Sequence, residues 1–170
     1  MKVSNLDDLF LTGLQYIYDA EQQLTEALPA MAKACSTPQL REAFSQHLEE
    51  TKQHVARAIE IFKRIGQEPQ AQPNSVLKQM RQEADQMIQN TEKAAIRDAA
   101  LIVAGNQVEH YEMACYGSLR TFARLLGHDD IVALIEKTLQ EEKNADAKLT
   151  ELGESEVNMQ ALHKTAAASA

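Results

Sequence analysis

Apolar side chains recur at helical spacing through four long segments of the chain, and this pattern limits the fold more than any other feature of the sequence. Strands are disfavoured, because aromatic residues make up 5% of the chain and Trp is absent. The pattern therefore predicts an all-α protein. The four segments cover about residues 4–34, 38–65, 93–126 and 130–152.

Residues that start or stop helices separate these segments. Thr37 and Pro38 are suited to be the N-cap and the first helical residue of the second segment. Pro29 lies inside the first segment, where we expect a kink or an irregular last turn. The other expected N-caps are Ser4, Ser75 and either Asp129 or Asp130. The expected helix ends are Gly66, Gly127 and Gly153.

The connections between the segments predict how the helices pair. Short turns join the first segment to the second and the third to the fourth. A longer crossover, made of a loop over residues 66–75 and a short helix over about residues 76–90, joins the two pairs. Two antiparallel hairpins with one long crossover are typical of a ferritin-like four-helix bundle. We expect this domain to span residues 1–153, and residues 154–170 to form a disordered tail.

The charge of the chain excludes several classes of partner. The chain has 17 Lys and Arg residues and 25 Asp and Glu residues, a formal net charge of −8. An acidic chain without a basic block is poorly suited to bind nucleic acid or an anionic membrane surface. No segment reaches the ~18 apolar residues of a membrane-spanning helix, and the N-terminus lacks a signal-peptide pattern. With Cys35 and Cys115 as isolated cysteines, the expected location is the cytoplasm.

Several acidic residues fall on the apolar faces of the long segments. Glu50 and His54 are four residues apart and share one face of a helix, and the same spacing relates Glu142 to Asp146. Glu141, in contrast, falls on a polar face. The inward-facing candidates are Glu21, Glu50, His54, Glu112, Glu142 and Asp146, with Glu109 at the edge of its apolar stripe.

The spacing of these residues places them at one height in the bundle. Glu21 and Glu50 are 29 residues apart, and Glu112 and Glu142 are 30 apart. Each pair spans one hairpin turn, so each acid lies roughly 22 Å from its turn at ~1.5 Å per residue. We therefore expect the acids of both hairpins to meet in the middle of the bundle.

Buried ionised carboxylates require protons, partners or a cation. Basic residues are absent from the inward-facing lines of these helices, which favours a cation. Carboxylates with imidazole are suited to iron or manganese, and two ions bridged by carboxylates would balance the charge. The sequence therefore predicts a site for two Fe ions, with Mn as the alternative.

The sequence resembles the YciE/YciF branch of the ferritin-like superfamily over residues 6–152. The segments that carry the resemblance are YDAEQQLTEALPAMAKA, HLEETKQHV, RDAALIVAGNQVEHYEMACYGSL and LQEEKNADAKLTEL. The resemblance implies a di-iron-type four-helix bundle, a cytoplasmic stress-response protein and a homodimer. It also implies ferroxidase activity as a hypothesis to test.

The chain departs from the usual ferritin-like pattern, in which the metal helices carry Glu-x-x-His. Here the pairs are Glu50-x-x-x-His54 and Glu142-x-x-x-Asp146, so a carboxylate replaces one imidazole. The sequence leaves open whether Glu109 and Asp146 are direct ligands or outer contacts. His47 is a weaker candidate for the same two roles, direct ligand or outer contact.

Two hypotheses for the function follow. In the first, the protein oxidises Fe(II) with dioxygen or peroxide. Glu21 and Glu112 are then terminal ligands, Glu50 and Glu142 bridge, and His54 and Asp146 complete the two ions. In the second, the protein is a non-enzymatic dimeric helical stress protein with a structural metal or none. A storage cage is a weaker third reading.

Overall fold

The protein is all-helical in the computed structural model, which describes residues 3–167. No strand occurs within these residues, which confirms the predicted fold class. The elements are α1 (Leu6–Ala34), α2 (Pro38–Arg64), α3 (Ser75–Asn90), α4 (Ala95–Leu125), α5 (Asp129–Leu152), the π-helix η1 (Gly153–Val157) and α6 (Asn158–Ala167). No helix in this part of the chain is long and apolar enough to cross a membrane.

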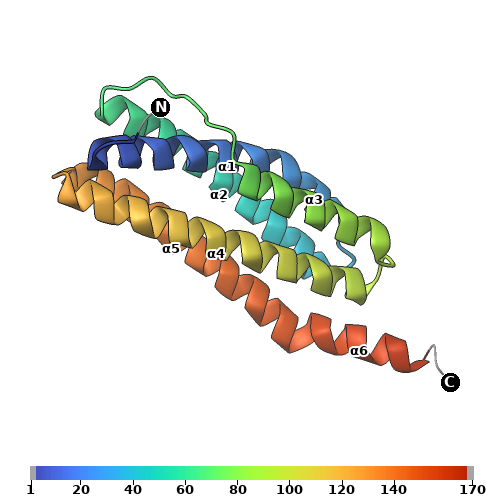
Figure 1. The fold of residues 1–170 in the computed structure, drawn as a ribbon. Helices are drawn as coiled ribbons and strands as arrows, with labels where there is room; N and C mark the ends of the chain where they lie inside the picture. The colour runs from blue at the N-terminus through green and yellow to red at the C-terminus, as the bar shows by residue number, and fades with distance from the viewer. Residues whose placement is uncertain (1–2, 168–170) are drawn as a thin grey trace.

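The four long helices form a bundle of two antiparallel hairpins (Figure 1). One hairpin is α1 with α2 and the other is α4 with α5, while α1 also packs on α4 and α2 on α5. The crossover contains α3, which packs on α4 and α1. The predicted connectivity is thus confirmed. The largest fully buried apolar side chains are Phe10, Leu14, Ile17, Leu40, Phe62, Leu77, Leu101, Ile131 and Ile135.

Asparagine side chains cap two helices, each one residue away from the position expected from the sequence. Asn5 caps α1, accepting a hydrogen bond of 2.7 Å from the backbone N–H of Asp8. The expected cap Ser4 instead donates its hydroxyl to the Asp8 carboxylate. Asn74 caps α3 in place of Ser75, accepting from the N–H of Leu77 at 3.0 Å. At the start of α5, neither Asp129 nor Asp130 is the cap, because the cap position is His128.

The turn between α1 and α2 is held by a residue from α4. Thr37 and Pro38 occupy the predicted N-cap and first helical positions, but Thr37 makes no side-chain cap. Its hydroxyl donates to the buried carboxylate of Asp98 at 2.6 Å. Asp98 also accepts from the backbone N–H groups of Ser36 at 2.8 Å and Thr37 at 2.7 Å. One carboxylate therefore fastens the first hairpin to the second.

Two of the three glycines expected to end helices do so. Gly66 and Gly127 have φ values of 68° and 79°, a conformation that favours glycine, after the ends of α2 and α4. Gly153 has φ −61° and ψ −52°, so the chain remains helical there. A Cβ on Gly153 would lie 3.6 Å from Ile102 Cγ2, so this glycine lies where the helix packs against α4.

The C-terminal segment is the main correction to the predicted fold. Residues 154–167 were expected to form a disordered tail, but they continue the helix through η1 and α6. Val157 is completely buried in the core, and α6 contacts α4. The sequence did not predict this helix, because Gly153 was expected to end the preceding one. Residues 168–170 of the expected tail lie outside the described part of the chain.

Helix α1 runs without interruption through Pro29.

Candidate metal centre

Six titratable side chains converge in the middle of the bundle, in an interior that is otherwise largely apolar. All six are buried, and each of the four long helices contributes at least one. We call them the six-residue cluster: Glu21 from α1, His47 and His54 from α2, Glu109 and Glu112 from α4, and Glu142 from α5. The expectation that acids from both hairpins meet at one height is confirmed for Glu21, Glu112 and Glu142, but not for Glu50.

The first half of the cluster, the His54 group, consists of Glu21, His54 and Glu142. His54 Nδ1 lies 2.9 Å from Glu142 Oε1 and 3.4 Å from Glu21 Oε1. One ligand atom from each of the three residues lies within 4.8 Å of the others, which is compatible with a single bound metal ion.

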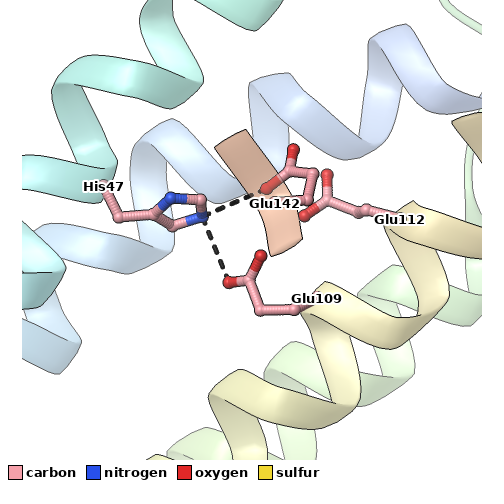
Figure 2. Close-up of side chains that lie close together, drawn as sticks. All are labelled: His47, Glu109, Glu112 and Glu142. Atoms are coloured by element: carbon pink, nitrogen blue, oxygen red, sulfur yellow. Dashed lines mark ion pairs between the residues drawn. The ribbon is translucent and has the colours of Figure 1, made fainter. Parts of the chain in front are cut away.

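The second half, the His47 group, consists of His47, Glu109, Glu112 and Glu142 (Figure 2). His47 Nε2 lies 3.2 Å from Glu109 Oε1 and 3.8 Å from Glu142 Oε2. Glu142 belongs to both groups, and its two oxygens face different histidines. This is the arrangement expected of a carboxylate that bridges two metal positions.

Several oxygens in this cluster have no hydrogen-bond partner among the described residues. They include both oxygens of Glu112, both of Glu142, and Oε2 of Glu21 and of Glu109. The contacts of Glu142 to the two histidines are therefore close in distance without the alignment of hydrogen bonds. Buried oxygens of this kind are costly unless a proton or a cation satisfies them.

Protons and imidazolium charges stabilise the cluster without a metal. Burial and the neighbouring carboxylates Glu21 and Glu142 raise the pKa of Glu112 well above its usual range. Burial opposes charge on His54, but Glu21 and Glu142 outweigh this and raise its pKa to about 10. Burial opposes charge on His47 in the same way, and Glu109 raises its pKa well above the usual value. A divalent cation would replace these protons.

Glu141 and Arg57 hold the His54 ring from outside the cluster. His54 Nε2 lies 3.0 Å from Glu141 Oε2. The Arg57 guanidinium donates to both oxygens of Glu141, with Nη2 at 3.0 Å from Oε1, and also to Thr138 Oγ1 at 2.7 Å. The Nδ1 atom of His54 is left to face the cluster. The sequence placed Glu141 on a polar face and gave no sign of this contact, because it depends on how α2 meets α5.

A buried tyrosine contacts Glu21. The Tyr116 hydroxyl donates to Glu21 Oε1, and burial together with Glu21 and Glu112 raises the pKa of Tyr116 well above its usual range, so the phenol keeps its proton. Tyr111, the tyrosine next to Glu112 in the sequence, instead accepts a hydrogen bond of 2.7 Å from Asn74 Nδ2. Tyr116 has no sequence signal beyond its place one turn after Glu112.

Two of the seven residues named from the sequence lie outside the cluster. The Glu50 side chain is 32% exposed, and its Oε2 lies 3.5 Å from His47 Nδ1. Asp146 is partly buried beside an exposed histidine, with Oδ1 at 3.2 Å from His110 Nε2. The other five named residues, Glu21, His54, Glu109, Glu112 and Glu142, are brought together.

His47 joins the cluster from the same helix line as His54. The two are seven residues apart, which is nearly two turns, whereas Glu50 is rotated roughly 50° away from that line. The seven-residue spacing was the available signal. The cluster therefore has four Glu and two His, rather than the set with one imidazole that the sequence suggested.

The chain is similar to known proteins over most of its length. The family described as a domain of unknown function, DUF892, matches residues 5–162. Protein YciF of Escherichia coli (strain K12) is 41% identical over 172 residues, covering 96% of this chain and 99% of YciF.

Two solved structures have the same fold. The crystal structure of the E. coli stress protein YciF gives a TM-score of 0.88 at 39% identity, covering 92% of this chain and 99% of that chain. YcfI from Rhodopseudomonas palustris gives a TM-score of 0.85 at 39% identity, covering 88% of this chain and 95% of that chain.

Proposed function

The chain belongs to the DUF892 family, and we propose that it is a ferritin-like protein whose six-residue cluster binds two metal ions, preferably iron. In this proposal the protein oxidises Fe(II) with dioxygen or peroxide. The observation that carries the proposal is the shared carboxylate Glu142, whose two oxygens face different histidines. The similarity to a protein described as the E. coli stress protein YciF supports a role in a stress response.

The chemistry of the cluster fits a pair of ions with mixed oxygen and nitrogen ligands. Four glutamates and two histidines are the ligand total of ferritin-like di-iron and di-manganese proteins, although those proteins draw them from Glu-x-x-His motifs. Here α2 supplies both histidines and α4 supplies Glu109 and Glu112. The orphaned oxygens of Glu112 and Glu142 favour a cation over a purely structural polar network.

Each side chain then has a role that follows from its contacts. Glu142 would bridge, while Glu21 and His54 would hold one ion and His47, Glu109 and Glu112 the other. Iron held in such a set supplies one-electron redox chemistry. Glu141 keeps the His54 ring oriented, and Tyr116 keeps Glu21 in place.

Anaerobic titration of metal-free protein with Fe(II) tests the proposal directly. We expect two ions per chain, followed by formation of Fe(III) and consumption of oxidant when dioxygen or hydrogen peroxide is admitted. Absence of stoichiometric binding would refute the metal centre. Binding with metal-dependent melting but without oxidation would support the alternative, in which the protein is a non-enzymatic stress protein with a structural metal. Glu142→Gln should lose oxidation and retain the helical circular dichroism spectrum.

We also propose that the protein is a cytoplasmic homodimer, in line with the resemblance noted from the sequence. Light scattering coupled to size-exclusion chromatography checks the assembly. A mass of two chains is expected, and a much larger particle would support a storage cage.

A further inference from the structure

The two histidines of the six-residue cluster differ in the contact made by the outer ring nitrogen, the one that faces away from the cluster. His54 Nε2 meets Glu141 at 3.0 Å, and Glu141 is fixed by two hydrogen bonds from Arg57. A histidine whose outer nitrogen is bound to a fixed carboxylate keeps its orientation and is a more basic ligand. The His54 group is thus supported from outside by side chains that are themselves held in place.

His47 has a looser outer contact. Its Nδ1 lies 3.5 Å from Glu50 Oε2, which is an ion-pair distance and longer than a hydrogen bond. Glu50 accepts a hydrogen bond of 3.2 Å from the exposed Gln46 amide. The nearest outer carboxylate of the His47 group is therefore a partly exposed side chain that can move.

A small opening leads from the surface to the His47 group. Its cavity has a volume of about 80 Å³ and lies between α2, α4 and α5. Such a volume accommodates several water molecules, given ~10–15 Å³ for one. Its lining includes the buried His47 and Glu109 and the partly exposed Glu50, but neither Glu21 nor His54. Lys148, the lysine of the lining, pairs with Glu151 at 2.9 Å.

We propose that metal ions enter and leave the centre through this opening, with Glu50 as the carboxylate that receives them before His47 and Glu109. The position held by the His47 group is then the exchangeable one, and the position held by the His54 group retains its ion. This inference rests on the proposed metal centre. It assigns Glu50 a role in uptake rather than the bridging role expected from the sequence.

Release of cobalt from protein loaded with two Co(II) ions tests the inequality of the two positions. When excess EDTA is added, the visible absorption of bound Co(II) should decay in two equal phases that differ in rate at least tenfold. His47→Ala should remove the fast phase, and His54→Ala should remove the slow one. Release in a single phase would overturn the proposal while leaving the metal centre intact. If the wild type binds no Co(II) and no Fe(II), the proposed function itself fails.

Narrowing the opening tests the route. Ala145 lines the cavity, so Ala145→Leu should slow Co(II) uptake and fast-phase release about tenfold, with two ions still bound at equilibrium. Ala147→Leu, at an exposed position of the same helix, is the matched control and should leave the rates unchanged. Equal rates in Ala145→Leu and Ala147→Leu would exclude this route.

Removing the charge at position 50 tests the entry residue without changing the volume of the side chain. Glu50→Gln should slow Co(II) uptake at low salt by at least threefold, within the range by which charges change association rates. Glu49→Gln removes an adjacent charge on an exposed residue that pairs with Lys52 at 2.6 Å, and it should retain the wild-type rate. If both variants lose uptake rate equally, general surface charge rather than Glu50 attracts the ion, and the assignment of Glu50 is wrong.

Discussion

At the scale of single residues, the carboxylates of the six-residue cluster lower the stability of the metal-free protein, and metal binding would remove this free-energy cost. Glu112 illustrates this. Burial raises its pKa most, and the neighbouring acidic groups and a thiol raise it further, so its surroundings disfavour the charged form. Neither of its oxygens has a hydrogen-bond partner among the described residues. Such a residue is poorly explained by folding stability alone, and a ligand role accounts for it.

Glu112→Gln should therefore stabilise the metal-free protein and weaken metal binding. At pH 8 we expect the free energy of unfolding to rise by about 1–3 kcal/mol, because the neutral amide does not need the proton that buried Glu112 takes up on folding. Chemical denaturation of metal-free protein measures this. Glu83→Gln, on the exposed face of α3, should change stability little. A less stable Glu112→Gln variant would contradict the expectation.

The metal-free protein should lose stability as the pH rises. The pKa of His54 in the folded chain is raised to about 10 from a usual value of 6.5, despite burial, by Glu21 and Glu142. The stabilisation by charged His54 is complete below its usual pKa and is lost as the pH rises toward 10. The raised pKa of Glu112 acts in the same direction.

Thermal melts between pH 6.5 and 10 check this prediction. Metal affinity should change in the opposite direction and rise with pH, because binding displaces protons from His54 and Glu112. A melting temperature of metal-free protein that rises across this range would contradict the assignment of charge to His54.

At the scale of helices, single buried residues decide how the elements are joined. Asp98 is the clearest case, since it connects α4 to the turn between α1 and α2 through three hydrogen bonds. Val157 has a corresponding role for the C-terminal segment, as it fixes η1 in the core. Neither residue belongs to the six-residue cluster, so both can be changed without removing a proposed ligand.

Asp98→Ala should lower the free energy of unfolding by about 2–4 kcal/mol, because it removes the partner of the buried Thr37 N–H and hydroxyl and of the partly buried Ser36 N–H. Denaturant unfolding is the measurement, and Glu92→Ala in the exposed connection before α4 is the control. The metal stoichiometry should stay at two. A loss no larger than that of the control would mean that this carboxylate does not fasten the hairpins.

Val157→Ala should lower the free energy of unfolding by about 1–2 kcal/mol, which is typical of removing buried methyl groups. Met159→Ala removes a side chain that is 51% exposed and should have little effect. Equal, negligible effects would favour the disordered tail first expected for this segment.

The sequence predicts helices better than it predicts the contacts between them. Apolar spacing located the four long helices and the crossover because each helix buries one continuous face. The same spacing ranked Glu50 above His47, because residues within about 60° on a helix are equally plausible as inward-facing until the partner helix is known. Glu141 and Tyr116 could not be assigned, since their contacts cross from one helix to another.

At the scale of the whole molecule, the net charge of −8 is partly a property of the interior. Four of the acids responsible for it are buried glutamates of the cluster. The four positive charges of two divalent ions equal half of the formal net charge in number, and in the bundle interior they would replace the protons of His54 and Glu112. Metal loading should therefore change the stability of the bundle more than it changes the charge of the protein surface.

Loading with metal should raise the melting temperature of the protein. Binding to the native state alone stabilises by about 2.7 kcal/mol per site when the free metal is 100 times the dissociation constant. Differential scanning calorimetry of metal-free and Co(II)-loaded protein measures the shift, and the double variant Glu112→Gln with Glu142→Gln should abolish it. A shift that persists in the double variant would place the stabilising ions elsewhere.

The distribution of the cluster over α1, α2, α4 and α5 also has a consequence for local motion. Glu21 and Glu142 are 121 residues apart in the chain, and the cysteines Cys35 and Cys115 form no disulfide. Two metal ions bound in the cluster would cross-link all four bundle helices, so that none of them could open alone without breaking ligation. In metal-loaded protein we expect amide hydrogen exchange in these helices to proceed through one common opening, whereas α3 and α6, which supply none of the proposed ligands, should still exchange by local unfolding.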